Sequence, residues 1–169
     1  MADINVMIAF DAATIVEQNP NASRNPDAPT YVDQSLIYMT TRHDHIVDMS
    51  SGAELNLRAE PGDAIKWRET TLSFNTEYKA LLYRYVSSSD HKLLRAPEIE
   101  VIDGVFPMPR EGTEGSPEFV TQNYQDHYWR AAVRSVGKVT YHFYFQILDR
   151  HRQLKGYFQW DPFITIENP

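Results

Sequence analysis

The strongest pattern in this chain is the run Val139-Thr140-Tyr141-His142-Phe143-Tyr144-Phe145-Gln146-Ile147-Leu148. Every second residue in it, beginning with the first, is β-branched or aromatic. A period of two with such residues predicts a β-strand that buries one face. The chain then turns near Arg150–Lys155, and the aromatic segment Tyr157–Trp160 is predicted to be the hairpin partner of this strand.

The end of the chain continues beyond a break. Asp161-Pro162 follows Trp160 directly, and Phe163-Ile164-Thr165-Ile166 resumes the alternation. Proline has no backbone N–H to donate to a strand ladder, so it marks an edge or a bend. We therefore predict a kink whose Trp160 is anchored in the core with its indole N–H bonded to an acceptor. In the alternative reading, Trp160 and Asp161 face solvent together as a ligand site.

Other segments repeat the period of two and are predicted to be strands. They are Ile4–Phe10, Ser35–Thr41, Glu54–Glu60, Ala80–Val86, Ile99–Ile102 and Tyr128–Val136. Pro61-Gly62-Asp63 is predicted to turn the chain in a hairpin after Glu54–Glu60, with Ile65 and Trp67 pointing inward on the returning strand. Phe10 and Leu57 are further predicted core residues.

Two regions rich in proline are predicted to be irregular. Glu17–Thr30 contains three prolines and reads as a long loop of consecutive turns. Asp90–Glu118 holds another proline cluster and reads as loops around the short strand Ile99–Ile102. Ser116-Pro117-Glu118 has the residue order of a helix start and predicts a short helix through about Gln125.

Short strands separated by turn signals, with little helical periodicity, indicate an all-β fold. The predicted architecture is an antiparallel β-sandwich, jelly-roll-like, with little helix. With 169 residues, the chain is predicted to form a single domain, residues 1–169.

Composition excludes several classes of function. A net charge of −7 argues against nucleic acid and anionic membranes as partners. The absence of cysteine excludes disulfides, thiol nucleophiles and cysteine-based metal sites, and it fits a reducing cytoplasm. No run approaches the ~18 apolar residues of a transmembrane helix, and the acidic start of the chain does not resemble a signal peptide. We therefore predict a cytoplasmic protein.

Two histidines are the best candidates for metal ligands. His43 and His45 flank Asp44, and in an extended segment residues two apart point the same way. They could chelate a divalent metal with a third ligand from His91, His127, His142 or His151. The alternative is a pair of exposed loop histidines, which we favour because two ligands make a weak site.

Sequence motifs of catalysis are absent. The chain has no Gly-x-Ser-x-Gly, no His-Glu-x-x-His and no phosphate-binding glycine loop. Its carboxylates are scattered and suggest no acid–base pair. We predict no enzymatic activity and no cofactor, and we keep a metal-dependent hydrolase only as the weakest alternative.

One aromatic cluster suggests a ligand site. Tyr124, Tyr128 and Trp129 lie near Asn123, Asp126 and His127 in the sequence. Aromatic faces beside amide and carboxylate groups are suited to binding a sugar ring. A carbohydrate-binding role for Asn123, Tyr124, Asp126, Tyr128 and Trp129 is therefore the second hypothesis. Packing of these aromatics in the β core is the more common use.

The chain resembles the AidA/PixA family of bacterial inclusion body proteins. Matching segments occur in the family's order over nearly the whole chain: Ile4-Asn5-Val6-Met7-Ile8, Asn19-Pro20-Asn21, Pro29-Thr30, Tyr38-Met39, Gly62-Asp63, Asn75, Ala80-Leu81-Leu82-Tyr83, Gly156-Tyr157-Phe158 and Trp160-Asp161-Pro162.

This resemblance implies a non-enzymatic bacterial protein whose partner is itself, as a homo-oligomer or an inclusion assembly. Some members of the family form crystalline inclusions, and others are controlled by quorum sensing and associated with a host. The inclusion-forming members are methionine-rich, whereas this chain has five methionines. The resemblance supplies no catalytic residues.

Overall fold

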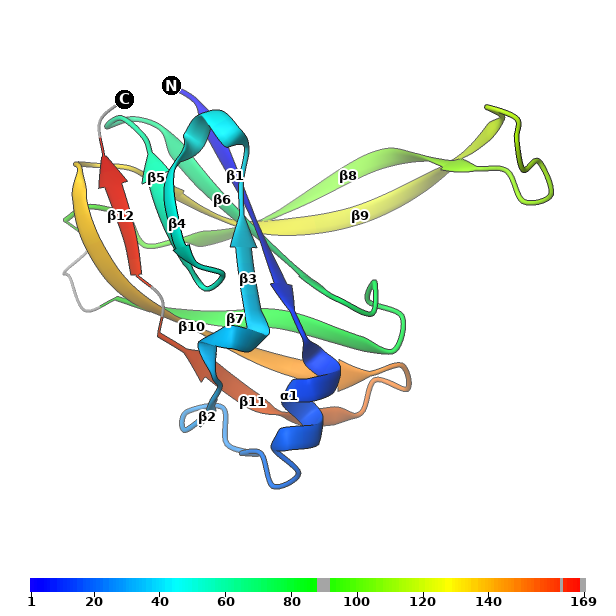
Figure 1. The fold of residues 1–169 in the computed structure, drawn as a ribbon, viewed down its shortest axis with the longest axis horizontal. Helices are drawn as coiled ribbons and strands as arrows, with labels where there is room; N and C mark the ends of the chain where they lie inside the picture. The colour runs from blue at the N-terminus through cyan, green and yellow to red at the C-terminus, as the bar shows by residue number, and fades with distance from the viewer. Residues whose placement is uncertain (88–91, 162, 168–169) are drawn as a thin grey trace.

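Two β-sheets packed face to face make up the body of the protein in the computed structural model, which describes residues 1–87, 92–161 and 163–167 (Figure 1). The five-stranded sheet has the order β3-β1-β6-β9-β8. Its strands are β1 Asp3–Phe10, β3 Ile37–Thr40, β6 Ala64–Thr71, β8 Glu98–Pro109 and β9 Phe119–Ala132.

The seven-stranded sheet is built around β10, Gly137–Asp149. Its order is β2-β11-β10-β12-β5-β4, and β7 also pairs with β10. The other strands are β2 Thr30–Tyr31, β4 Ile46–Ser51, β5 Glu54–Arg58, β7 Tyr78–Ser87, β11 Leu154–Trp160 and β12 Phe163–Glu167. The helical segments are short: α1 Ala12–Gln18, η1 Gln34–Leu36 and η2 His43–His45.

This architecture confirms the all-β sandwich with little helix. The pairs β1–β6, β2–β11 and β5–β12 are parallel, so both sheets are mixed. Parallel pairing joins segments that lie far apart in the sequence, and alternation within one strand carries no information about it. Within the described residues, no helix has the length and apolar character that crossing a bilayer requires.

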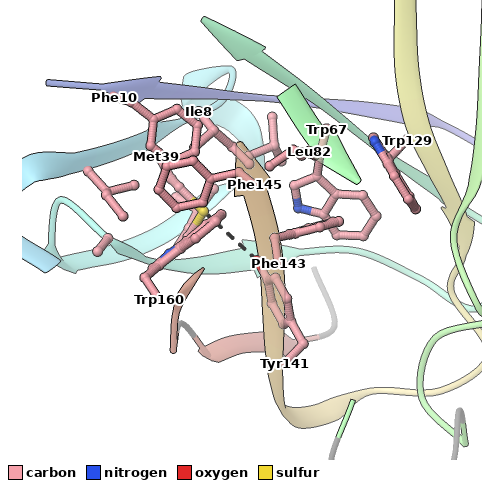
Figure 2. Packing of buried hydrophobic residues seen from close by; sticks show 14 of the residues in the cluster. Ile8, Phe10, Met39, Trp67, Leu82, Trp129, Tyr141, Phe143, Phe145 and Trp160 are labelled. Atoms are coloured by element: carbon pink, nitrogen blue, oxygen red, sulfur yellow. Dashed lines mark hydrogen bonds between the residues drawn. The ribbon is translucent and has the colours of Figure 1, made fainter. Parts of the chain in front are cut away.

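Aromatic side chains from both sheets meet in the core (Figure 2). Trp67 of β6 packs edge-on against Phe143 of β10, with 5.7 Å between ring centroids. The ring centroids of Phe10 in β1 and Phe145 in β10 lie 4.4 Å apart. These rings are fully buried, as predicted, and so is Leu57. The alternation of β10 therefore marks the face that binds the two sheets together.

The structure interrupts the chain's last strand at the predicted place, because β11 ends at Trp160 and β12 begins at Phe163. β11 pairs with the second half of β10 and β12 with its first residues, in one continuous register on either side of Asp161. Trp160 is fully buried beside Phe10 and Phe145, which confirms its anchoring role. Its indole Nε1 has no hydrogen-bond partner among the described residues, contrary to the prediction. Pro162 lies outside the described residues.

The predicted hairpin after Glu54–Glu60 is wrong. β5 pairs with β4 and β12, whereas β6 joins β1 and β9 in the other sheet. The turn Pro61-Gly62-Asp63 therefore carries the chain between sheets. Gly62 has a φ of 102°, which favours glycine. The Asp63 carboxylate accepts hydrogen bonds from the backbone N–H groups of Ala2 and Glu60, which confirms its reading as a turn residue.

Two further expectations are corrected. The helix predicted from Ser116-Pro117-Glu118 is absent, because residues from Phe119 onward belong to β9. The short strand Ile99–Ile102 is the start of the much longer β8. The sequence reading also missed α1, whose first turn is capped by the Asp11 carboxylate accepting from Thr14 N–H at 3.2 Å.

A carboxylate in the β10–β11 turn supplies a pH-dependent prediction. Asp149 forms an ion pair with Lys155 at 2.9 Å and accepts from the N–H groups of His151 and Gln153. The hydrogen bond from Lys155 is the main cause that lowers the pKa of Asp149 to about 2.

The lowered pKa means that the fold favours the ionised form of Asp149. Its stabilising effect should be complete above the ordinary pKa of 3.8 and should disappear as the pH falls through about 2. An NMR titration of the carboxyl carbon should show a midpoint near 2. The melting-temperature difference between wild type and Asp149→Asn should shrink over the same interval. A midpoint at the ordinary value would contradict this.

Candidate functional site

The most unusual feature of the molecule is a two-stranded arm. β8 and β9 pair with each other along their length: Glu98 lies opposite Arg130 at one end, and Pro109 lies opposite Phe119 at the other. The two strands project from the body as a ribbon (Figure 1). Pairing between β9 and β6 ends at Trp129 and Trp67, so among the described residues the outer part of β9 pairs with β8 alone. At about 3.3 Å per residue, the twelve residues of β8 span about 40 Å.

The arm has an apolar surface on both sides. Side chains alternate, so its two faces follow from the pairing register. One face, here called the pocket face, exposes Ile102, Phe106, Met108, Val120 and Tyr124. The other, the core-side face, exposes Ile99, Val101, Val105 and Phe119. Residues 104–109 and 119–125 carry no charged side chain. Exposed apolar patches of this kind mark interaction sites.

Tyr124 packs against its neighbours on the pocket face. Its ring lies across Gly104, where a Cβ would come within 2.6 Å of the ring. It also packs edge-on against Phe106, with 5.9 Å between ring centroids. Glycine at position 104 thus lets the aromatic ring lie flat on the opposite strand, a device that orders exposed ribbons.

The β8 edge of the arm is protected against strand addition. Pro107 and Pro109 lie in β8, the edge strand, and proline removes two backbone donors from it. Edge prolines are a common defence against edge-to-edge pairing. Strand addition along the β8 edge is therefore disfavoured, which leaves the two faces of the arm and its β9 edge open to contacts.

A pocket of about 560 Å³ lies at the base of the arm, on the outer side of the five-stranded sheet. Its lining comes from β1, β6, the base of the arm and the segment after β3. The lining residues are Asn5, Val6, Met7, Thr40, Thr41, Arg42, Lys66, Arg68, Ile102, Asp126, His127 and Tyr128. The volume falls in the range that accepts a small ligand or a few side chains.

The cations of the pocket lining already have carboxylate partners. Lys66 donates to Asp3 at 2.6 Å, and its Nζ lies 4.8 Å from the centre of the Tyr128 ring. The hydrogen bond to Asp3 is the main cause that raises the pKa of Lys66. Arg42 pairs with Asp44 at 2.7 Å, and both side chains are mostly exposed. An exposed pair of this kind exchanges partners at little cost.

Arg68 and Asp126 form the ion pair nearest to the arm. Burial raises the pKa of Asp126, but the hydrogen bonds from Arg68 and from the His127 N–H outweigh it, so this pKa lies below its usual value. Tyr128 donates its hydroxyl hydrogen to Glu100 at 2.6 Å, a bond that raises the tyrosine pKa. The polar groups in the pocket are thus tied to neighbours within the chain.

A buried carboxylate lies where the arm leaves the sheet. The side chain of Glu69 is fully buried, and its Oε1 accepts from Leu82 N–H at 3.2 Å. The same oxygen lies 2.7 Å from His127 Nε2. Glu69 is on β6 and His127 on β9, just beyond the last paired residues of these strands. This contact, with Arg68–Asp126 beside it, fixes the arm to the body.

The residues predicted from sequence as a sugar site do not form one cluster. Asp126 and Tyr128 line the pocket. Asn123 and Tyr124 lie farther out and border a separate hollow on the arm. Trp129 is buried and packs 5.8 Å from Phe143, so it belongs to the core.

The predicted metal pair lies elsewhere. His43 and His45 are in the 3-10 turn η2 rather than in an extended segment. Side chains in such a turn do not repeat every second residue, so the geometric premise of chelation is not met. Within the described residues, no group of three or more His, Asp or Glu side chains is placed to hold a metal. His91 lies outside the described residues.

Sequence reasoning missed most of this surface. Lys66 and Arg68 alternate with the predicted inward residues Ile65 and Trp67, and no sequence signal singles them out, although they line the pocket. The apolar residues from Val105 to Met108 lie in the region predicted to be loop, because prolines and a glycine occur there. Ile99, Val101 and Ile102 with Val105 and Phe106 were the available signal, because a surface loop seldom carries so many large apolar residues.

Comparisons with known proteins agree with this fold. A family model described as PixA, inclusion body protein, matches residues 2–166. The crystal structure of a PixA inclusion body protein from Burkholderia cenocepacia J2315 is similar to this chain with a TM-score of 0.79. The match has 21% sequence identity and covers 98% of this chain and 96% of that one, so it shows the fold alone. Comparison with curated proteins gives no match.

Proposed function

The chain belongs to the PixA family of inclusion body proteins, and we propose that it acts by associating with copies of itself, without enzymatic activity. The observation that carries this proposal is the arm. An isolated two-stranded ribbon is at best marginally stable in water, yet this one exposes large apolar side chains on both faces. Contact with another copy would cover them.

Two apolar faces on one ribbon support an assembly that grows. A contact that uses one face leaves the other free for a further neighbour. The prolines in β8 oppose uncontrolled strand addition along that edge. We place this assembly in the bacterial cytoplasm, which suits a chain without cysteine.

Removing apolar side chains from the arm should abolish self-association. We expect concentration-dependent oligomers of the wild type in multi-angle light scattering. The triple variant Val105→Ser, Phe106→Ser, Phe119→Ser should raise the dissociation constant at least about thirtyfold, because the loss of even one large apolar anchor costs about 2 kcal/mol. Its melting temperature should stay near that of the wild type, since these side chains are exposed.

The matched control replaces three equally exposed apolar residues away from the arm, Tyr31→Ser, Leu72→Ser and Phe74→Ser. This control should associate like the wild type. A wild type that remains monomeric up to millimolar concentration would overturn the proposal, as would an equal loss of association in the control.

Carbohydrate binding is the second candidate, because Asp126 and Tyr128 line a pocket of suitable size. Calorimetry against a panel of sugars separates the two functions. Saturable binding by a monomer, lost in Tyr128→Ala, would favour a carbohydrate-binding module over assembly.

A further inference from the structure

The pocket face of the arm and the pocket form one continuous surface. Ile102, Asp126 and Tyr128 line the pocket, and Tyr124 and Phe106 follow on the same face of the ribbon. The tip loop, residues 110–118, lies at the far end. From Ile102 to Arg110 is eight residues along β8, which is about 26 Å in an extended strand.

This length suits a symmetric pair of arms. In a two-fold dimer the same surface serves both copies, and residue pairs across the axis are reciprocal. If two pocket faces stack in antiparallel fashion with an overlap of about 26 Å, the tip loop of each copy reaches the pocket of the other. Phe106 then lies near the axis, together with Tyr124.

The apolar faces supply part of the area that a specific contact needs. The exposed parts of Ile102, Phe106, Met108, Val120 and Tyr124 amount to roughly 400 Å² per copy, taking roughly 200 Å² for a large side chain. Two such faces bury roughly 800 Å². A stable interface buries ~1,200–2,000 Å², so the two loops entering the two pockets must supply roughly 400 Å² or more.

Charge complements this arrangement. In the tip loop, Arg110 pairs with Glu118 at 3.5 Å, so Glu111 and Glu114 leave the loop negative. The pocket lining contains three cations, each beside a carboxylate: Arg42 pairs with Asp44, Lys66 with Asp3, and Arg68 with Asp126. Arg42 is the most exposed of the three, and its surface pair with Asp44 can be exchanged at little cost.

We infer that two copies of this chain stack their arms antiparallel, pocket face on pocket face, with the acidic tip loop of each seated in the pocket of the other, where its glutamates meet Arg42. The inference rests on the proposed self-association and specifies its first step. The core-side faces stay exposed in this dimer and serve further growth.

Charge reversal tests the contact between tip and pocket. Glu111→Lys with Glu114→Lys, and separately Arg42→Glu, should each weaken the dimer at least about tenfold, because each homodimer then has two repulsive contacts. An equimolar mixture of the two variants should restore affinity to within about threefold of wild type, since both contacts of the heterodimer are complementary. The control Arg150→Glu, in the exposed β10–β11 turn, should change nothing.

Cross-linking provides a second measurement. The chain has no cysteine, so introduced thiols report a single contact. A mixture of Glu114→Cys and Thr41→Cys proteins should form a disulfide-linked heterodimer on mild oxidation. Each variant alone should not, because like positions are about 26 Å apart in the antiparallel pair.

Substitutions of two adjacent residues test which face of the arm makes the contact, because Phe106 lies on the pocket face and Val105 on the core-side face. Phe106→Ser should weaken the dimer at least about thirtyfold and Val105→Ser less than about threefold. The inference fails if Val105→Ser has the larger effect, if the mixture shows no rescue, or if tips cross-link to tips. One of these results could occur while the wild type still self-associates and the triple arm variant does not. In that case the proposed function would stand, and only the antiparallel geometry would be refuted. A strictly monomeric wild type would refute both.

Discussion

Replacing Phe143 with alanine should lower the free energy of unfolding by about 3–5 kcal/mol. Phe143 is fully buried and contacts three tryptophans, one from each of three strands. Its ring packs edge-on against Trp67 and Trp129 and stacks on Trp160. The substitution leaves a cavity at the centre of the sandwich, and rigid rings from both sheets cannot collapse to fill it.

The neighbouring Tyr144 is the matched control. It lies on the opposite face of β10, half-buried, where it contacts Tyr83 and Arg84. Tyr144→Ala should cost about 1 kcal/mol, as is common for surface contacts. Urea unfolding of both variants measures the two values. A larger loss for Tyr144→Ala would mean that the strand presents its other face to the core.

The sandwich was predictable because its core strands obey one local rule. In β10, β1 and β6, the residues that face the other sheet alternate with polar or exposed residues. The buried face of each strand can therefore be identified from its own sequence, even when its pairing partner is unknown. Pairing was not predictable to the same degree. The parallel contact of β1 with β6 joins Ile4 to Ile65, and the two segments share no turn that would reveal it.

The arm escaped prediction for a physical reason. A strand is recognised when one face is buried and the other is solvated, but both faces of the arm are apolar and exposed. Pro107, Pro109 and Gly104 are also residues that favour loops in most contexts. Here the prolines are tolerated because β8 is an edge strand, and Gly104 is needed because Tyr124 lies on it.

The site was partly predictable. Asp126 and Tyr128 were selected because an aromatic ring beside a carboxylate suggests a ligand surface, and both line the pocket. Trp129 was selected for the same reason but points to the core, since neighbours on a strand face opposite sides. Lys66 and Arg68 are about 60 residues away in sequence, and only the pairing of β6 with β9 brings them to Tyr128 and Asp126.

His127→Leu should destabilise the protein by about 2–4 kcal/mol, an effect close to that of a core cavity. The carboxylate of Glu69 is fully buried, and His127 Nε2 is its only side-chain contact within 3 Å in the described residues. Leucine removes that partner but leaves the charge buried, with Leu82 N–H as the remaining hydrogen-bond donor and Arg68 Nη1 at 3.8 Å from Oε2. A buried carboxylate that loses a strong partner keeps its full cost of desolvation.

A second substitution separates this cause from lost packing. Adding Glu69→Gln to His127→Leu removes the buried charge while keeping an acceptor for Leu82 N–H, so the double variant should be more stable than His127→Leu alone. His43→Leu, at an exposed histidine, should stay within about 0.5 kcal/mol of wild type. Urea unfolding at neutral pH measures all three. If the double variant is less stable than His127→Leu, the unpaired charge is not the cause. The junction between arm and body would then depend on the shape of the imidazole rather than on its bond to Glu69.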